Sequence, residues 1–332
     1  MAKKYENMSD NSSYEPELKK QKSFNPFDFI YNRDGKGVDK GELSVLEKPG
    51  IANFFKLFWR RFNQIFGANL LLVFGNFPIF FVLIAMAYTT IDATAPSRQI
   101  FSALEAVSRF DNSPVVSSMM GIFGGQDFVS VPTTLTYVFF AIAALVLVTF
   151  GPVNAGTTYV FRNIVREEPV FVWSDFWYAI KKNWKQALVY GVIDILMIVM
   201  LVYDVITYRY NVDSNMGMFM FVISMSMSVY YYFIRMYIYP MMVTFDMSML
   251  KLIKNGMLFG ILGIKRNIMV LLGTIVIALL EFMLLAYLPS VAVMLPVLII
   301  FGLLGYMCMY GTYPKIKEVM IDPYYKESDV EE

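Results

Sequence analysis

The stretch Thr149-Phe-Gly-Pro-Val-Asn-Ala-Gly-Thr-Thr-Tyr-Val-Phe-Arg-Asn-Ile-Val-Arg-Glu-Glu168, with the residues that follow it to Gln186, decides the fold. An apolar run, Leu135 to Phe150, leads into it, and another, Ala187 to Val202, follows. Between these runs lie a Gly-Pro pair, five Lys or Arg residues and three of the four tryptophans. Tryptophan and basic side chains gather where a chain meets lipid headgroups. The pattern therefore predicts a chain that leaves a bilayer at a Gly-Pro break, lies along its surface and enters it again.

The composition of the whole chain is that of a membrane protein. Hydrophobic residues make up 57% of the 332 residues and charged residues 17%, against about 45–50% and 25% in soluble domains. The mean hydropathy is +0.51. A net charge of +1 provides no overall field for nucleic acid. We therefore expect the lipid bilayer, and no nucleic acid, among the partners.

The chain lacks the residue patterns that most enzymes and metal proteins use. It has no histidine, and Cys308 is its only cysteine, so the usual general base and the commonest metal ligands are missing. Its glycines near lysine do not have the spacing of a phosphate-binding loop. We therefore predict a protein that is not an enzyme and that has no catalytic residue, cofactor or metal.

The apolar runs predict an all-α fold: a polytopic membrane protein with about six transmembrane helices and amphipathic helices at the cytosolic interface. Each run has the roughly 20 residues that a 30 Å hydrocarbon core requires, and continuous apolar runs exclude the alternating strands of a barrel. The predicted spans are residues 68–90, 132–151, 187–208, 216–240, 267–287 and 290–310. They form a membrane domain, residues 51–314, with an external connection at 91–131. A mostly disordered cytosolic tail precedes it at 1–50, and a short polar tail follows at 315–332.

Basic residues indicate the orientation. A basic pair precedes each odd-numbered span, whereas the external connections hold only Arg98, Arg109 and Arg209. Loops rich in Lys and Arg stay on the cytoplasmic side. We therefore predict a multi-pass protein of the cell membrane with both termini in the cytoplasm.

Two inner connections predict helices that lie on the membrane surface. Ser174 is the expected N-cap of a helix that reaches Gln186. In the second connection, Met247–Leu262, four apolar residues recur at helical spacing: Leu250, Ile253, Met257 and Ile261. Two interpretations stay open. Such helices only float at the interface or pad the bundle, or their outer face docks a cytosolic or membrane partner.

Three charged residues fall inside the predicted spans: Asp194, Arg235 and Glu281. Charges at this depth are unfavourable and usually face a bundle interior or a water-filled cavity. Asp194 lies about 10 Å and Arg235 about 8 Å in from the inner ends of neighbouring antiparallel spans, at 1.5 Å per residue. Their depths predict an ion pair. The alternative is that Arg235 extends to the interface while Asp194 is protonated or bonded to a hydroxyl or tyrosine. Glu281 is either a packing residue or part of a solute pathway.

Several short motifs resemble one known family. They are Thr149-Phe-Gly-Pro152, Ala155-Gly-Thr-Thr-Tyr-Val160, Val165-Arg-Glu-Glu168, Trp173-Ser-Asp-Phe176, Lys182-Asn-Trp-Lys-Gln186, Asn69-Leu-Leu-Leu72, Phe77-Pro-Ile79 and Tyr239-Pro-Met-Met-Val-Thr-Phe-Asp246. Over residues 54–275 the chain resembles the YesL-like family of bacterial integral membrane proteins (domain of unknown function 624). About 70 residues separate the Pro-Ile step from the Gly-Pro motif here, where typical members have almost none. The resemblance implies a role near carbohydrate uptake, because such genes often accompany carbohydrate ABC importers.

These observations lead to two functional hypotheses. The first is a non-catalytic accessory or scaffold protein associated with carbohydrate ABC import, with ABC transporter permease subunits or another membrane protein as its partner. The second is a small-solute (sugar) transporter that uses its charges within the membrane. The family motif and docking candidates for the first are Gly151, Pro152, Arg162, Trp173, Asp175, Phe176, Lys181, Lys182, Asn183, Trp184 and Lys185.

Overall fold

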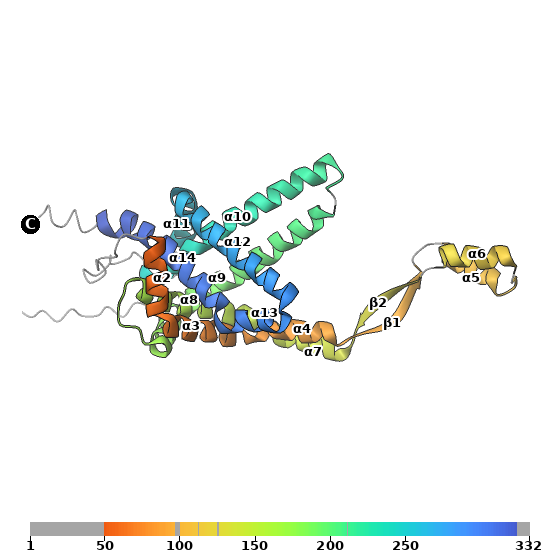
Figure 1. Ribbon diagram of the computed structural model, residues 1–332, viewed down its shortest axis with the longest axis horizontal. Coiled ribbons are helices and arrows are strands. Elements are labelled where there is room, and N and C mark those ends of the chain that lie inside the picture. The colour runs from red at the N-terminus through yellow and green to blue at the C-terminus, as the bar shows by residue number, and fades with distance from the viewer. Residues whose placement is uncertain (1–49, 97–99, 112, 125, 211, 324–332) are drawn as a thin grey trace, which may run out of the picture.

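The computed structural model describes residues 50–96, 100–111, 113–124, 126–210 and 212–323. Figure 1 shows a bundle of long helices with a thin arm that projects from one end. By length and composition, five helices in the described part are able to cross a membrane. The number is six if the bent pair α3 and α4 counts as one span. The predicted all-α polytopic class is therefore confirmed. The tail predicted at 1–50 lies almost wholly outside the described residues, and the tail predicted at 315–332 lies partly outside them.

The helices of the first half are α2 (Ile51–Arg60), α3 (Phe62–Gly75), the 3-10 turn η2 (Phe77–Ile79), α4 (Phe80–Ala87), α5 (Phe101–Ser108), α6 (Pro114–Phe123), α7 (Thr134–Ala143) and α8 (Val146–Val165). The strands are β1 (Thr89–Pro96) and β2 (Gln126–Pro132). The second half contains α9 (Val172–Arg209), α10 (Asn215–Thr244), α11 (Met249–Leu262), α12 (Ile264–Tyr287), α13 (Pro289–Leu295), the π-helix η3 (Pro296–Ile300), α14 (Phe301–Ile316) and the π-helix η4 (Lys317–Ile321).

Helices α8 and α9 form the centre of the bundle, and the break predicted at Gly151-Pro152 is wrong. Helix α8 continues through Pro152 to Val165. The glycine serves a close helix crossing, because a Cβ on Gly151 would meet the Ala187 carbonyl and the Gly191 backbone. Proline removes one helical hydrogen bond, which a transmembrane helix tolerates when its neighbours pack tightly. The Gly-Pro pair therefore marks the point where α8 packs closely against α9.

The surface helix predicted from Ser174 to Gln186 is the first part of the 38-residue helix α9, which begins at Val172. Ser174 is not its N-cap. Asp175 instead accepts a hydrogen bond from the Phe171 amide at 3.1 Å. The two parts stay one helix because the buried face runs on without a break, through Phe176, Ala179, Asn183, Gln186, Ala187, Tyr190, Gly191 and Asp194. That face packs against α8 and α10, so a kink would unpack it.

The first and last spans are each interrupted partway. Helices α3 and α4 meet at an angle of 53° around Pro78. In the last span Pro296 opens the π-helix η3, and Asn69 of α3 bonds to this irregular backbone. Its Nδ2 donates to the Val297 carbonyl at 2.6 Å, and its Oδ1 accepts from the Gly302 amide at 2.6 Å. A buried amide thus satisfies backbone groups that a regular helix would pair internally.

The last helix continues past residue 314, where the sequence places the start of a polar tail. Helix α14 reaches Ile316 and η4 reaches Ile321. Ile316 and Ile321 are fully buried, and they pack into the two apolar cores of the bundle. Burial of these two side chains holds the chain helical beyond the apolar run that the sequence shows.

The external connection predicted at 91–131 forms the projecting arm. Strands β1 and β2 pair antiparallel, with Thr89 opposite Pro132 and Pro96 opposite Gln126. At the far end α5 and α6 pack on each other (Figure 1). Helix α5 buries its Phe101 and Leu104 side chains at the tip of the arm. This hairpin departs from the all-helical pattern of the remaining described chain.

Helix α11 confirms that the second inner connection is helical, but its packed face differs from the predicted stripe. Leu252, Gly256 and Phe259 are buried. Leu250 and Ile261 are more than half exposed, at 54% and 63%. Leu250, Met257 and Ile261 therefore lie on the outer face of α11, whereas Ile253 is partly buried and packs against the core.

Candidate functional site

The predicted ion pair between Asp194 and Arg235 is present. It joins α9 to α10, and Arg235 Nε lies 3.0 Å from Asp194 Oδ1 and 2.8 Å from Oδ2. The Asp194 side chain is 0% exposed, whereas that of Arg235 is 30% exposed. Arg235 lies nine residues before the end of α10, about 13 Å at 1.5 Å per residue. The alternative, an arginine that extends to the interface, is therefore not what the structure shows.

Two tyrosines complete the surroundings of Asp194, so the tyrosine contact that the alternative proposed is present beside the ion pair, although the sequence analysis assigned neither residue to it. Tyr231 OH donates to Oδ1 at 2.8 Å, and Tyr239 OH donates to Oδ2 at 2.9 Å. With the two contacts from Arg235 Nε, both carboxylate oxygens accept two hydrogen bonds each. A signal for these tyrosines was available, because Tyr231, Arg235 and Tyr239 recur at four-residue spacing and so share one face of a helix.

The outer edge of Arg235 faces a cavity inside the bundle. The cavity has a volume of about 500 Å³ and lies between α3, α8, α10, α12 and α14, with η2 and η3 at its border. Its polar lining residues besides Arg235 and Tyr239 are Asn76, Asn154, Thr157, Thr158, Tyr232, Thr274 and Cys308. Arg235 Nη1 and Nη2 have no hydrogen-bond partner among the residues that the structure describes. The cavity thus contains an anchored guanidinium with its outer edge open.

Aromatic rings support Arg235 from two sides. Its guanidinium carbon lies 5.6 Å from the centroids of the Phe150 and Tyr239 rings. A cation at this distance is attracted to a ring face. Phe150 comes from α8, so three helices hold the guanidinium in place. A group fixed in this way keeps its position when a ligand arrives, which limits the entropy lost on binding.

Glu281, the third charge within the predicted spans, lies apart from the Asp194–Arg235 pair. It lies on α12, is partly buried, and does not line the cavity. Its Oε2 is buried without a hydrogen-bond partner among the described residues. The three charges predicted from sequence therefore divide into a pair and a separate carboxyl group.

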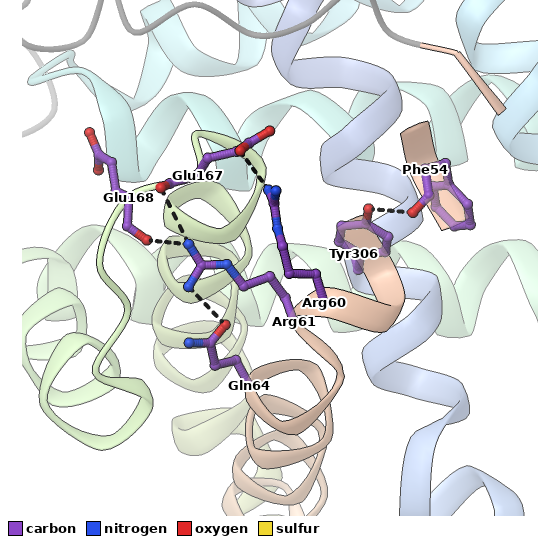
Figure 2. A network of polar contacts seen from close by, with 7 residues as sticks. All are labelled: Phe54, Arg60, Arg61, Gln64, Glu167, Glu168 and Tyr306. Carbon is purple, nitrogen blue, oxygen red and sulfur yellow. Dashed lines mark hydrogen bonds and ion pairs between the residues drawn. The ribbon is translucent and has the colours of Figure 1, made fainter. Parts of the chain in front are cut away.

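Arginine and glutamate side chains also pair away from the bundle interior, at the end of the bundle that carries most of the basic residues. We call this group the surface cluster: Arg60, Arg61, Arg166, Glu167 and Glu168. Figure 2 shows four of its members, Arg60, Arg61, Glu167 and Glu168. Arg60 Nη2 lies 2.5 Å from Glu167 Oε2. Arg166 Nη2 lies 2.5 Å from Glu168 Oε1. The cluster joins the start of the first span to the loop between α8 and α9.

Arg61 acts on the backbone of that loop. Its Nη2 donates to the carbonyls of Glu167 and Glu168 at 3.3 Å each. Glu167 has a φ of 58°, in the left-handed region that ends many helices. A cation near exposed carbonyls at a helix C-terminus is favourable. Figure 2 shows the Arg61 side chain reaching these carbonyls from the α2–α3 junction, while Tyr306 OH donates to the Phe54 carbonyl at 3.0 Å.

The docking candidates divide into two groups by burial. Gly151, Arg162, Phe176 and Asn183 are buried, and Arg162 Nη1 donates to the Val243 carbonyl at 2.8 Å. Their role is to hold the bundle together, which removes them from any docking surface. The candidates that remain at the surface, exposed or partly exposed, are Trp173, Asp175, Lys181, Lys182, Trp184 and Lys185, while Pro152 is half-buried beside Gly151.

Comparisons with known proteins identify one segment. Residues 131–205 match the model of a family described as a protein of unknown function, DUF624. No curated protein and no solved structure matches the chain. The match confirms the resemblance to domain of unknown function 624 for α7, α8 and most of α9, and it includes Gly151 and Asp194. Within the described residues no group of three or more histidine, cysteine, aspartate or glutamate side chains is placed to hold a metal ion.

Proposed function

We propose that this protein is a small-solute transporter that binds its solute in the cavity at Arg235. The observation that carries the proposal is the open outer edge of Arg235, held by Asp194, in a cavity of about 500 Å³. Small-molecule sites have volumes of about 300–1,000 Å³, and charged side chains within a membrane mark solute pathways. The protein works by binding and moving its solute, without a chemical step.

The two interrupted spans support this function. Asn76 and Ile79 lie at the bend of the first span, Pro296 and Val297 lie in the π-helix of the last, and all four line the cavity. Transporters bind solutes where helices are broken inside the membrane, because free backbone groups and flexible joints meet there. The α3–α4 bend and η3 are therefore the expected hinges of a pathway that opens to each side in turn.

We place the end that carries the surface cluster in the cytoplasm, following the positive-inside rule. All four tryptophans are exposed at that end, with Trp59 and Trp173 at 69% and 65%. They suit the aromatic belt of a membrane interface. In this orientation the arm lies outside the cell membrane and both termini lie in the cytoplasm.

Cys308 provides a direct test, because it lines the cavity and is the only cysteine. Intact cells and inside-out vesicles are treated with a membrane-impermeant thiol reagent, and modification of Cys308 is measured by mass spectrometry. A solute pathway that opens to each side in turn predicts modification in both preparations.

A matched control moves the cysteine to the outside of the bundle. The chain with Cys308→Ser and Leu272→Cys carries its thiol on α12, where the Leu272 side chain is 56% exposed and does not line the cavity. This thiol faces lipid and should resist the same reagent from either side. Absence of Cys308 modification from both sides, with full modification after denaturation, would rule out the pathway.

A second candidate is an accessory protein of a carbohydrate ABC importer, as the resemblance implies. The favouring observation is the outward face at the start of α9, where Trp173, Lys181 and Lys182 are exposed while the opposite face packs on α8. Permease subunits of such an importer are the partner for this face. Replacing Lys181, Lys182 and Lys185 by Gln should release a docked partner from the purified complex. If the helix only lies at the interface, the three changes weaken its attraction to anionic lipid by about 1 kcal/mol per charge and leave co-purification unchanged. Unchanged co-purification would therefore contradict docking at this face.

A further inference from the structure

Among the residues that the structure describes, the outer edge of Arg235 is the one charged hydrogen-bond donor in the cavity lining. Most of the other polar side chains around it are already bonded, within their own helix or to a neighbouring one; in the described part of the chain the Thr158 hydroxyl and Asn76 Oδ1 are the exceptions. Asn154 Nδ2 donates to the Phe150 carbonyl at 2.8 Å, and Thr157 Oγ1 donates to the Val153 carbonyl at 3.0 Å. Thr274 Oγ1 donates to the Val270 carbonyl at 3.0 Å and lies 2.8 Å from Tyr232 OH. Few groups are left for a ligand with many hydroxyls.

The remaining wall of the cavity is apolar. It is formed by aliphatic and aromatic side chains from four spans, among them Leu72, Phe80, Phe150, Phe161, Val297 and Leu304. A polar ligand group buried against such a wall without a partner is unfavourable. An apolar ligand body is favoured there by the removal of its surface from water. The wall therefore selects against a neutral sugar.

The charge of the site limits the ligand further. Asp194 already balances the charge of Arg235, and its oxygens are fully used by Arg235, Tyr231 and Tyr239. The free Nη1 and Nη2 form a planar fork, the geometry that binds a carboxylate through two parallel hydrogen bonds. A dianion such as a phosphate monoester would leave two negative charges uncompensated in a site of low dielectric constant, and a monoanion leaves one.

We propose that the solute is an amphiphilic monoanion, with a carboxylate on the Arg235 fork and an apolar body along the cavity wall. This inference rests on the proposed function and gives it a substrate class. It replaces the sugar that the resemblance implies with a carboxylic acid of the medium-chain or fatty-acid kind. A free acid from water and a fatty acid from the bilayer share this chemistry.

Protection of Cys308 measures binding. The full-length protein in nanodiscs of neutral lipid is incubated with octanoate, octanamide or maltose, and the rate of Cys308 alkylation by N-ethylmaleimide is followed. Octanamide matches octanoate in size and lacks only the charge. We expect saturating octanoate to slow alkylation at least about tenfold, as a ligand that covers the thiol does, while octanamide and maltose change it less than twofold.

Two variants assign the protection to the fork. Because Arg235→Gln alone strands Asp194, the variant used is Asp194→Asn with Arg235→Gln, which keeps the charge balance. It should lose octanoate protection. Glu281→Gln, which removes an intramembrane charge outside the cavity, should keep it. Equal protection in the double variant would overturn the assignment to Arg235.

A second measurement distinguishes a ligand that comes from water from one that comes from the bilayer. Mass spectrometry of the protein purified in mild detergent detects a retained fatty acid if the bilayer supplies it, and none if the solute enters from water. Protection by maltose but not by octanoate would overturn the ligand class and leave the transporter intact. No protection by any ligand, with Cys308 modified from neither side of the membrane, would overturn both proposals. No protection with modification from both sides would overturn the ligand class alone.

Discussion

The same two side-chain types, arginine and a carboxylate, pair at two depths of this bundle. In the surface cluster the Arg60 and Glu167 side chains are 48% and 40% exposed. Inside the bundle Arg235 is 30% exposed and Asp194 is 0% exposed. Water screens the first pair and competes for its hydrogen bonds. In the inner pair only the outer edge of Arg235 is open, while Asp194 and its contacts are closed to water, so the two pairs have different consequences when one partner is lost.

The surface cluster stabilises the fold, whereas the inner pair holds a side chain ready at the cavity. Arg61 donates hydrogen bonds to two carbonyls of the loop after α8, and these bonds stabilise the end of that helix. Asp194 uses only the Nε side of Arg235 and leaves the other edge to the cavity. A purely structural pair has no reason to keep half of the guanidinium unbonded in an apolar cavity.

Loss of one inner partner should have the largest effect on stability. Asp194→Asn and Arg235→Gln each strand the other group, which should lower stability by about 2–3 kcal/mol. The double variant should lie within about 1 kcal/mol of the parent, because no charge remains unpaired. Thermal unfolding in mild detergent measures all three. If the two single effects simply add in the double variant, the inner pair is not coupled as described.

Arg61→Gln should have the next largest effect. It removes the donors to the Glu167 and Glu168 carbonyls and the cation at the end of α8, at about 1–2 kcal/mol. Arg61→Lys keeps the charge without the fork and should recover part of the loss. The same unfolding measurement applies, and a variant as stable as the parent would show that the loop needs no cap.

Removing one hydroxyl from the inner site should have a smaller effect. Tyr231→Phe and Tyr239→Phe each delete one hydrogen bond to Asp194, and such bonds within membranes contribute about 0.6 kcal/mol on average. Neither change should matter once Asp194 and Arg235 have been replaced. A loss of the same size in that double background would indicate that the hydroxyls act by packing instead.

The exposed ion pair should have the smallest effect. Arg60→Gln should lower stability by less than about 1 kcal/mol. Raising the salt concentration from 0.1 M to 1 M should remove most of that difference, since the Debye length falls from about 10 Å to 3 Å. The same change in salt should leave the effect of Asp194→Asn almost unaltered. Equal salt dependence of the two effects would contradict the contrast in environment.

The depth of a charged residue along its helix was predictable from sequence, whereas the contacts between neighbouring helices were not. The spacing of Asp194 and Arg235 from the inner ends of their spans predicted their pairing. The Gly-Pro pair misled, because proline usually ends a helix and the close approach of Gly151 to α9 depends on a partner helix remote in sequence. The cavity was equally hidden. It is formed by five spans, and the bond from Asn69 to the η3 backbone has no local signature.

The most direct test of the central claim is the charge preference of Cys308. An anionic and a cationic methanethiosulfonate reagent of similar size are compared on the full chain, with each rate corrected for reaction with a free thiol. If Arg235 makes the cavity a site for anions, the anionic reagent should react about tenfold faster, equivalent to about 1.4 kcal/mol. That preference should fall to near one in the Asp194→Asn, Arg235→Gln variant. Equal rates in the parent protein, or the same preference in the variant, would contradict an anion site at Arg235.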